Sequence, residues 1–371
     1  MAAPANFWET LFGTDPGTAG GAQVEMRLLR KRGRPFLLLP RSAKAAALSL
    51  QLYPAQTAPA RIARALLRGG VGLSMPFGME NVACTVSFGD PFVRFVASLA
   101  GEKKDELPPL GILAGNPASD GQRFLLLVFD ANEKPVAVVK AGLSERAKML
   151  IEKEESFLRA LDGKTTGIPR VRGVCESARL RAFALDFFPG DSPRRRHEAF
   201  IPSLLSSWVD RTRKIPIRET ADWARVEGAV TATDSLWLAV RRLGDWSIHP
   251  AIQHGDFAPW NIKVSRTGAW TVLDWERGEM AGIPGWDWFH YVIQPAILVE
   301  RLRVFGLIQR VEALLSSPSF KEYAALAGIE GCQRELFLGY LLHAIEVIKP
   351  SEGFGATREL AAALASRWRS V

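Results

Sequence analysis

The sequence lacks the features that would place the chain in a membrane or crosslink it. Its three cysteines, Cys84, Cys175 and Cys332, lie far apart without a CxxC pair, so neither a disulfide framework nor a zinc site is indicated. No apolar run approaches the roughly 18 residues of a membrane span, and the richest, LFLGYLLHAIEVI, is interrupted by His343 and Glu346. The first residues, MAAPANFWETLFG, lack the basic and apolar regions of a secretory signal. These absences predict a soluble, cytoplasmic protein.

The composition is typical of a globular protein with more than one domain. The chain has 371 residues, of which 47% are hydrophobic and 23% charged. Its net charge of +8 favours anionic partners such as nucleotides. The basic residues are scattered, with the densest groups at 193–197 and 30–34, and no nucleic-acid module accompanies them. We therefore interpret them as solvated surface, with nucleic-acid binding as the less favoured alternative.

Residues 1–105 look separable from the rest of the chain in composition. VEMRLLRKRGRPFLLLP predicts two short strands around a basic turn, and RSAKAAALSLQLY, TAPARIARALLRGG and FVRFVASLA predict three helices. None of these segments groups residues that could perform chemistry, so they form an N-terminal α/β extension of unknown role. GEKKDELPP, residues 101–109, is a candidate linker.

From Gly111 onward the pattern changes to short β-rich runs separated by turns. GILAG, RFLLLVF, PVAVVK, VRGVCES and RLRAFALDFF predict five strands, with one helix from Ser144 to Leu161 between the third and the fourth. After Pro189-Gly190 the chain is mostly helical, except at 252–275. The sequence therefore predicts an α+β protein with a small β-rich lobe, 106–190, and a larger helical lobe, 191–371. A ligand cleft is expected at their boundary.

The motif HGDFAPWNI holds a carboxylate, Asp256, and an amide, Asn261, on either side of a loop that Pro259 keeps out of regular helix. IKV and AWTVL then flank the turn SRTG, and the hairpin they predict would bring Asn261 close to Asp274. An amide and a carboxylate together are suitable Mg²⁺ ligands, and Asp256 would be available to accept a proton. Singly, each residue would more often cap a turn or end a strand. Their order and spacing favour a site.

HxDxxxxN followed by a hairpin and an Asp is the catalytic signature of the protein-kinase-like superfamily. HGDFAPWNI…VLDWE resembles its aminoglycoside phosphotransferase and choline kinase branch more than the protein kinases. Ala258 stands where protein kinases have Lys, Trp275-Glu276 replaces Phe-Gly, and no Ala-Pro-Glu element follows. The resemblance covers roughly Gly111 to the C-terminus. It implies a two-lobed protein-kinase-like fold that uses ATP and Mg²⁺.

The resemblance places the phosphate-binding lysine at Lys140, and the following helix supports this independently. Glu154 falls within an apolar stripe at helical spacing and therefore needs a cation, for which Lys140 is the natural partner. Glu155 is predicted to point away from the stripe. The alternative is that these are surface charges.

The resemblance also implies further roles. The carbonyl of Asp186 and the N–H of Phe188 would meet the adenine, and AGNPASDG would replace the GxGxxG loop of protein kinases. Asp287 would brace the catalytic loop, although it could equally be an N-cap, and His254 is predicted to brace the same loop. The other histidines, His197, His249, His290 and His343, show no metal-ligand spacing.

These features predict an ATP-dependent phosphotransferase acting on a hydroxyl of a small molecule such as a sugar, an amino alcohol or an aminoglycoside-like compound. Its acceptor pocket could include Glu276, Glu279 and the tryptophans Trp260, Trp270, Trp275, Trp286 and Trp288, although most of these tryptophans are better interpreted as core. The alternatives are a nucleotide-binding pseudokinase that acts as an interaction module, and a protein kinase. Because every expected ATP contact lies beyond Gly111, the sequence predicts ATP binding without residues 1–105.

Overall fold

The computed structural model is an α+β protein that divides into two compact units. Unit 1 comprises Met1–Gly163 and Pro169–Phe188, and unit 2 comprises Lys164–Ile168 and Pro189–Val371. The structure describes residues 7–13, 22–53, 58–72, 78–101, 106–115, 121–161, 165–349 and 353–369. The break after Phe188 falls beside the Pro189-Gly190 pair. Across these described ranges, no helix has the length and apolar character needed to cross a membrane.

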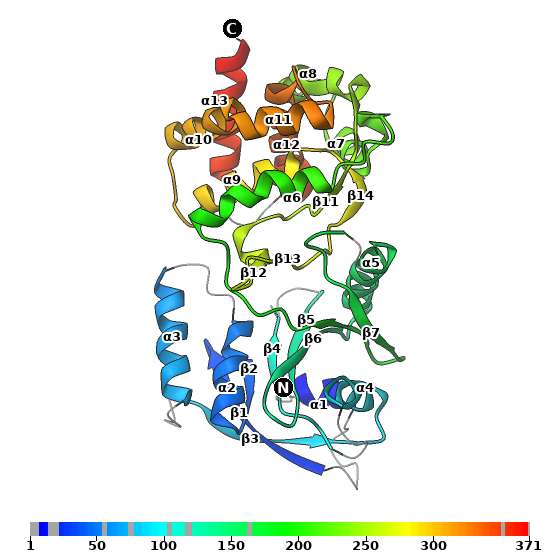
Figure 1. Cartoon of the computed structure of the whole chain (residues 1–371), viewed down its shortest axis with the longest axis vertical. Helices are drawn as coiled ribbons and strands as arrows, with labels where there is room; N and C mark the ends of the chain where they lie inside the picture. The colour runs from blue at the N-terminus through cyan, green and yellow to red at the C-terminus, as the bar shows by residue number, and fades with distance from the viewer. Residues whose placement is uncertain are drawn as a thin grey trace. The chain divides into compact units, whose positions relative to one another are not determined.

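Unit 1 contains one eight-stranded antiparallel sheet, in the order β3-β1-β2-β4-β5-β6-β8-β7 (Figure 1). The strands are β1 (Ala22–Lys31), β2 (Arg34–Pro40), β3 (Glu80–Val86), β4 (Leu110–Ala114), β5 (Arg123–Phe129), β6 (Pro135–Gly142), β7 (Val171–Glu176) and β8 (Arg181–Asp186). The seven strands that the sequence predicts in this part of the chain are confirmed. The edge strand β3 was not predicted.

Helices cover both faces of this sheet because alternate residues of each strand point to opposite sides. The helices are α1 (Phe7–Phe12), α2 (Ala43–Ser49), α3 (Ala58–Gly72), α4 (Pro91–Ala100) and α5 (Glu145–Leu161), with a 3₁₀ turn at Leu50–Leu52. The apolar side chains of α1 and α4 pack on one face, against residues such as Leu38, Ile112 and Val139. Those of α2 and α3 pack on the other, against Leu37 and Leu113.

The N-terminal extension is part of this sheet and not a separable domain. Strand β2 pairs with β4, with Leu37 opposite Leu113 and Leu38 opposite Ile112. One core contains Trp8 and Phe12 of the extension together with Ile112 and later strands of the β-rich lobe. Composition suggested a boundary near residue 105, but strand pairing and core packing cross it. Residues 102–105 of the candidate linker lie outside the described residues.

We therefore expect that deleting residues 1–105 yields an insoluble or unfolded chain, contrary to the prediction from sequence. The deletion would expose the apolar face of β4 and β5 and leave β4 as an unpaired edge, a combination that promotes aggregation. Soluble yield, size-exclusion chromatography and circular dichroism of the truncated and full chains would measure this. A soluble truncated monomer that unfolds cooperatively would contradict it.

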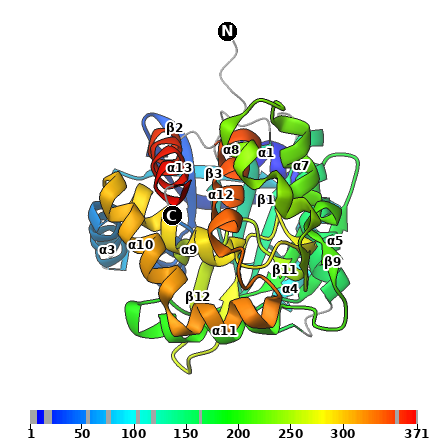
Figure 2. The same ribbon diagram turned by 90° about the horizontal axis from the view of Figure 1, so that it is seen from above.

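Unit 2 is mostly helical and carries three two-stranded sheets, β9 with β10, β11 with β14 and β12 with β13. Helix α12 contacts α7, α8, α9 and α13, which can be followed in Figure 2. The α-helices are α6 (Ile201–Ser207), α7 (Ala221–Ala229), α8 (Ser235–Val240), α9 (Trp286–Leu298), α10 (Val304–Ser316), α11 (Pro318–Ala327), α12 (Gln333–His343) and α13 (Phe354–Arg369). The strands are β9 (Ile215–Pro216), β10 (Ser247–Ile248), β11 (Ala251–Gln253), β12 (Ile262–Val264), β13 (Trp270–Val272) and β14 (Glu279–Gly282). Short 3₁₀ turns lie at Arg195–Phe200, Ile217–Glu219, Arg241–Asp245 and Pro259–Asn261, and a π-helical turn lies at Ala344–Ile348.

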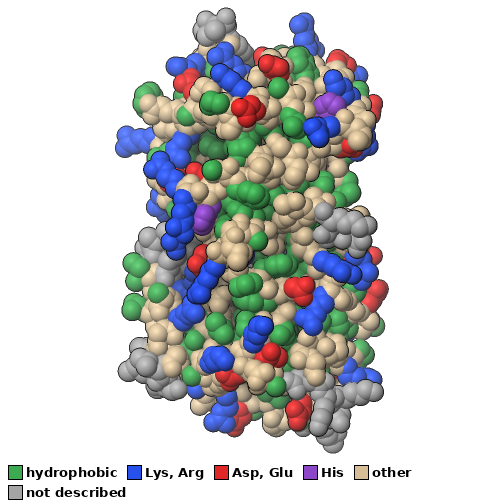
Figure 3. Space-filling model, in the orientation of Figure 1, with side chains coloured by type: hydrophobic (Ala, Val, Ile, Leu, Met, Phe, Trp, Pro, Cys, Tyr) green, Lys and Arg blue, Asp and Glu red, His purple; other side chains and the backbone are tan. Residues whose placement is uncertain are grey.

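The two densest basic groups of the sequence belong to different units. Residues 30–34 form the β1–β2 turn of unit 1, and residues 193–197 lie in unit 2. On the face drawn in Figure 3, Lys and Arg side chains are dispersed among apolar and acidic ones.

Candidate active site

The segment HGDFAPWNI links β11 to β12, and its two polar residues are joined to each other. A 3₁₀ turn at Pro259–Asn261 follows the loop, so Asn261 folds back towards Asp256. The Asn261 Nδ2 donates to the Asp256 main-chain oxygen and to its carboxylate Oδ2, both at 2.9 Å. The predicted β12–β13 hairpin forms, with Ile262 opposite Val272. It continues through a 2.7 Å hydrogen bond from the Leu273 N–H to the Asn261 carbonyl, which places Asp274 one residue beyond Asn261's partner.

His254 ties the loop to the strand that leads to Asp274. Its Nδ1 accepts a hydrogen bond from the Asp256 N–H at 3.1 Å, so its Nε2 carries the proton and donates to the Leu273 carbonyl at 2.8 Å. Burial lowers the pKa of His254 to about 4, so the ring is neutral. The Leu273 carbonyl is thereby fixed by His254, and the Leu273 N–H is fixed by the Asn261 carbonyl. His254 holds the geometry of the loop and has no nitrogen left for proton transfer.

Asp287 holds the same loop from the first turn of α9. Its carboxylate accepts hydrogen bonds from the N–H groups of His254 at 2.7 Å and Gly255 at 3.0 Å, rather than capping its own helix. Burial raises the pKa of Asp287 to about 7, although both donors favour the charged form. Gly255 has φ +77°, and a Cβ there would lie 2.8 Å from the Cβ of Arg277. The tight turn before Asp256 therefore requires glycine.

The carboxylate of Asp256 has a second partner that the sequence did not reveal. His290, on α9, places its Nε2 2.9 Å from Asp256 Oδ1, and the Tyr340 hydroxyl of α12 lies 3.1 Å from His290 Nδ1. Burial alone would raise the pKa of Asp256, but the hydrogen bond from His290 opposes it, and the pKa lies below its usual value. A signal was present, because His290 follows Asp287 by three residues and so shares its face of the helix.

Asn261 and Asp274 are the candidate metal ligands. Because the nitrogen of the Asn261 amide is committed to Asp256, its oxygen is the atom suited to a metal. Asp274 has φ +71°, a left-handed conformation that is uncommon for residues other than glycine and recurs at functional sites. Among the described residues no group of three or more His, Cys, Asp or Glu could enclose a metal. Two oxygen ligands fit Mg²⁺, which completes its shell with water and substrate phosphates.

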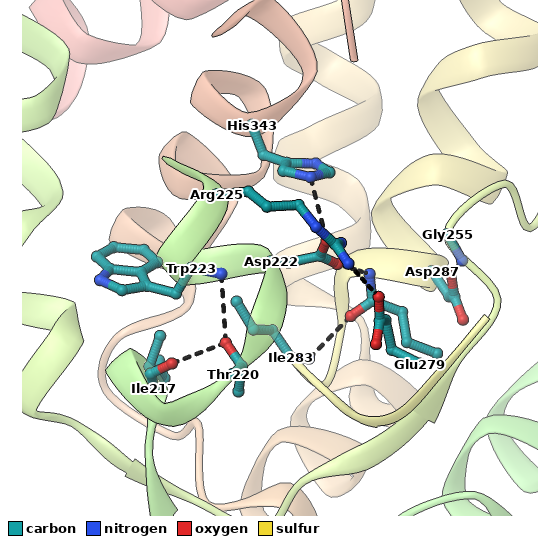
Figure 4. Close-up of polar contacts among 11 residues, drawn as sticks. Ile217, Thr220, Asp222, Trp223, Arg225, Gly255, Glu279, Ile283, Asp287 and His343 are labelled. Atoms are coloured by element: carbon teal, nitrogen blue, oxygen red, sulfur yellow. Dashed lines mark hydrogen bonds and ion pairs between the residues drawn. The ribbon is translucent and has the colours of Figure 1, made fainter. Parts of the chain in front are cut away.

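A buried polar network supports the segment HGDFAPWNI through the preceding residue, Gln253 (Figure 4). Gln253, the residue before His254, donates from Nε2 to Asp222 at 2.6 Å and accepts from the Ile283 N–H at 2.8 Å. Asp222 also contacts Arg225 and lies 3.3 Å from His343 Nε2. Burial opposes the charge of Asp222, but His343 and then Arg225 hold its pKa below the usual value. The network thus joins α7 and α12 to β11 and β14.

In unit 1, Lys140 and Glu154 form the ion pair expected from the sequence. The Lys140 Nζ lies 2.5 and 2.7 Å from the two carboxylate oxygens of Glu154, whose side chain is fully buried. The side chain of Glu155 is also buried, which the sequence did not predict, and contacts Arg159 at 2.5 Å and Arg181 at 3.0 Å. Helix α5 packs against both β6 and β8, so neighbouring carboxylates reach cations on different sides.

We expect Glu154→Gln to lower kcat/KM for ATP at least tenfold, a loss of about 1.4 kcal/mol. Glu155→Gln is the matched control, since it loses a buried ion pair on the same helix without releasing Lys140, and should change kcat/KM less than threefold. Steady-state kinetics with thermal unfolding of both variants would separate activity from stability. Equal losses of kcat/KM would show that Glu154 does not orient Lys140.

The residues expected to bind adenine lie where unit 1 ends. Asp186 is the last residue of β8, opposite Ala137, and the Phe187 N–H donates to the Val136 carbonyl at 3.2 Å. Because strand backbone groups alternate, those of Asp186 and Phe188 point away from β6. On that side the pairing of β7 with β8 starts at Leu185, so β7 does not pair with Asp186 or Phe188. The AGNPASDG loop lies largely outside the described residues, which stop at 115 and resume at 121.

The residues suggested for an acceptor pocket are largely used elsewhere. Trp270, Trp275, Trp286 and Trp288 are buried core residues, and Glu279 is paired with Arg225. Of the five tryptophans, Trp260 alone is half-buried.

A cavity of about 30 Å³ lies between α9, α12 and the loop, and is lined by Trp286, His290, Tyr340 and His343 among others. That volume holds one or two water molecules. Ligand pockets usually measure about 300–1,000 Å³, so this cavity cannot hold a sugar ring.

No protein-family model and no curated protein matches the sequence. Among solved structures, a thermostable mutant of aminoglycoside phosphotransferase APH(4)-Ia in its apo form matches with a TM-score of 0.50 and 13% identity, over 75% of this chain and 100% of that chain. The chain shares the fold of this phosphotransferase. The similarity of fold agrees with the resemblance of HGDFAPWNI…VLDWE to the aminoglycoside phosphotransferase branch.

Two further solved structures of aminoglycoside phosphotransferases match at lower scores. A thermostable mutant of APH(4)-Ia in complex with ADP and hygromycin B has a TM-score of 0.47 and 14% identity, over 74% of this chain and 97% of that chain. APH(3'')-Id from Streptomyces rimosus has a TM-score of 0.39 and 14% identity, over 62% of this chain and 92% of that chain.

Proposed function

We propose that this protein is an ATP-dependent phosphotransferase that moves the γ-phosphate to a hydroxyl of a small molecule. The observation that carries the proposal is the arrangement of Asp256, Asn261 and Asp274: the first two are hydrogen-bonded, and the third follows the partner of Asn261. APH(4)-Ia, whose fold the chain shares, is an aminoglycoside phosphotransferase. The fold alone would not carry the activity, because one fold hosts many functions.

In this proposal unit 2 supplies the chemistry. Asn261 and Asp274 would hold Mg²⁺, whose charge would offset that of the phosphates. Asp256 accepts the hydrogen bond of the acceptor hydroxyl and takes its proton as the O–H bond breaks. The acceptor oxygen bonds to the γ-phosphorus, the bond from that phosphorus to the bridging oxygen breaks, and ADP leaves. His254 and Asp287 keep the loop in the geometry that this step needs.

Unit 1 supplies the nucleotide contacts. Residues 106–190 form the nucleotide-binding lobe, in which Glu154 holds Lys140 so that its ammonium orients the phosphates. The Asp186 carbonyl and the Phe188 N–H bind the adenine edge. Residues 191–371 form the lobe with the catalytic loop and the acceptor site. Residues 1–105 have no part in the chemistry, although they complete the sheet on which Lys140 lies.

A phosphorylation assay tests this function. The full chain would be incubated with Mg²⁺·ATP and a library of sugars, amino alcohols and aminoglycosides, and products would be detected by mass spectrometry. The expected product gains one phosphoryl group and forms with an equal amount of ADP. Phosphorylation of a generic protein substrate, assayed in parallel, would instead identify the chain as a protein kinase. A chain that binds ATP but phosphorylates nothing and hydrolyses no ATP would favour a nucleotide-binding module.

A further inference from the structure

Three side chains from distant parts of unit 2 form a hydrogen-bonded chain that ends on the candidate base. Tyr340 of α12 contacts His290 of α9 at 3.1 Å, and His290 contacts Oδ1 of Asp256 at 2.9 Å. An ionised carboxylate can only accept, so the proton of His290 lies on Nε2. Nδ1 is then an acceptor, and the Tyr340 hydroxyl donates to it. The carboxylate of Asp256 therefore fixes the tautomer of the neutral ring, and the Tyr340 hydroxyl provides a partner for Nδ1.

This chain acts on the side chain of Asp256, whereas the backbone of the loop is held by other groups. Asp287 accepts from two loop N–H groups, and His254 joins the loop to Leu273. A purely structural role for His290 would duplicate these contacts. Instead, the Asp256 carboxylate is hydrogen-bonded at both oxygens, to His290 at Oδ1 and to Asn261 at Oδ2. Rotation of the carboxylate about its Cβ–Cγ bond would break both hydrogen bonds.

We propose that His290 is a positioning residue for Asp256, and that the Tyr340 hydroxyl holds the ring of His290 in place through Nδ1. The inference rests on the proposed phosphotransferase function. A hydrogen bond donated to a carboxylate reduces its basicity, so a gain must come from orientation. Phosphoryl transfer depends mainly on positioning and electrostatics, which makes orientation the more valuable contribution. A carboxylate has about four lone-pair positions, so Asp256 can still accept from the acceptor hydroxyl.

The test compares substitutions that keep or lose the N–H donor at the position of His290 Nε2. Gln can place its amide nitrogen there, Asn has the same amide on a shorter side chain, and Leu has no donor. Turnover would be followed by coupled ADP release, first with Mg²⁺·ATP and water and then with an acceptor found in the screen. We expect kcat to fall about 30- to 100-fold in His290→Leu and His290→Asn, and less than about fivefold in His290→Gln. Tyr340→Phe should lower kcat about three- to tenfold.

Affinity for a non-hydrolysable ATP analogue, measured by titration calorimetry, should stay within threefold of wild type in every variant. Thr357→Val is the control, because Thr357 is a buried polar residue of α13 whose hydroxyl donates to the Gly353 carbonyl, away from the catalytic loop in the sequence. It should lower the melting temperature and leave kcat within threefold. ¹⁵N NMR of histidine-labelled wild-type chain should show His290 protonated on Nε2.

If the wild-type chain neither binds nor hydrolyses ATP, the proposed function is overturned, and this inference with it. If the wild-type chain is active and His290→Leu matches it, the inference alone is overturned. Should the Leu variant fail to fold, the comparison of Gln with Asn decides, and equal kcat values would overturn the inference. A proton on Nδ1 of His290 would also overturn it.

Discussion

Asp256→Asn should lower the kcat of phosphoryl transfer by about 10²–10⁴, the usual value of general acid–base catalysis, while leaving affinity for Mg²⁺·ATP nearly intact. Asn has the shape of Asp but cannot accept the proton of the acceptor hydroxyl. The candidate metal ligands, Asn261 and Asp274, remain in place. The loss should therefore fall on turnover and not on nucleotide binding.

The loop should survive this substitution for a structural reason. Both oxygens of Asp256 accept hydrogen bonds, so the amide nitrogen of an Asn must face one of two donors. His290 can adapt by moving its proton to Nδ1, because the Tyr340 hydroxyl can accept as well as donate. The loop backbone remains fixed by His254 and Asp287.

Titration calorimetry with a non-hydrolysable ATP analogue and coupled ADP release would measure the two effects, with melting temperature as the control for folding. Turnover of Asp256→Asn equal to wild type would mean that HGDFAPWNI is a structural loop, and the phosphotransferase proposal would fail.

Asp274→Ala should weaken the binding of Mg²⁺·ATP by at least about 100-fold. Substituting groups that merely support metal ligands typically costs 10- to 100-fold in metal affinity, so loss of a ligand should cost more. The effect requires the metal: in the presence of EDTA the variant and the wild type should bind the ATP analogue equally weakly.

Backbone strain offers another explanation for such a loss and needs its own control. Asp274 has φ +71°, where Ala is disfavoured by roughly 1–2 kcal/mol. Asp274→Gly removes the carboxylate without that strain. Similar losses in the Ala and Gly variants would assign the effect to the carboxylate, whereas a Gly variant with wild-type affinity would show that strain caused it. If Asp256→Asn loses nucleotide binding and Asp274→Ala keeps it, the two roles are reversed.

The features that the sequence predicted correctly depend on short stretches of chain. The strands β4 to β8, helix α5 and the β12–β13 hairpin follow from apolar periodicity and from turns such as SRTG. The Lys140–Glu154 pair was predicted because a buried carboxylate on an apolar stripe needs a cation. In each case the residues that decide the outcome lie within one or two neighbouring elements.

The errors have a common origin in tertiary packing. The burial of Glu155 was not predicted because a lone helix has one buried face, but α5 packs against both β6 and β8. Residues 1–105 looked separable because composition does not report strand pairing, and β2 adds to β4 across the expected boundary. Which strand pairs with the free edge of another depends on how the whole sheet assembles.

The sequence by itself determined the loop and the hairpin that bring Asp256, Asn261 and Asp274 together within about twenty residues, and so predicted these three as the groups that perform chemistry. Only the tertiary structure decided how the carboxylate of Asp256 is held, since His290 and Tyr340 reach it from 34 and 84 residues away along the chain. Helical periodicity shows which face of α9 is buried, but a histidine on that face has no partner until α12 and the loop pack against it.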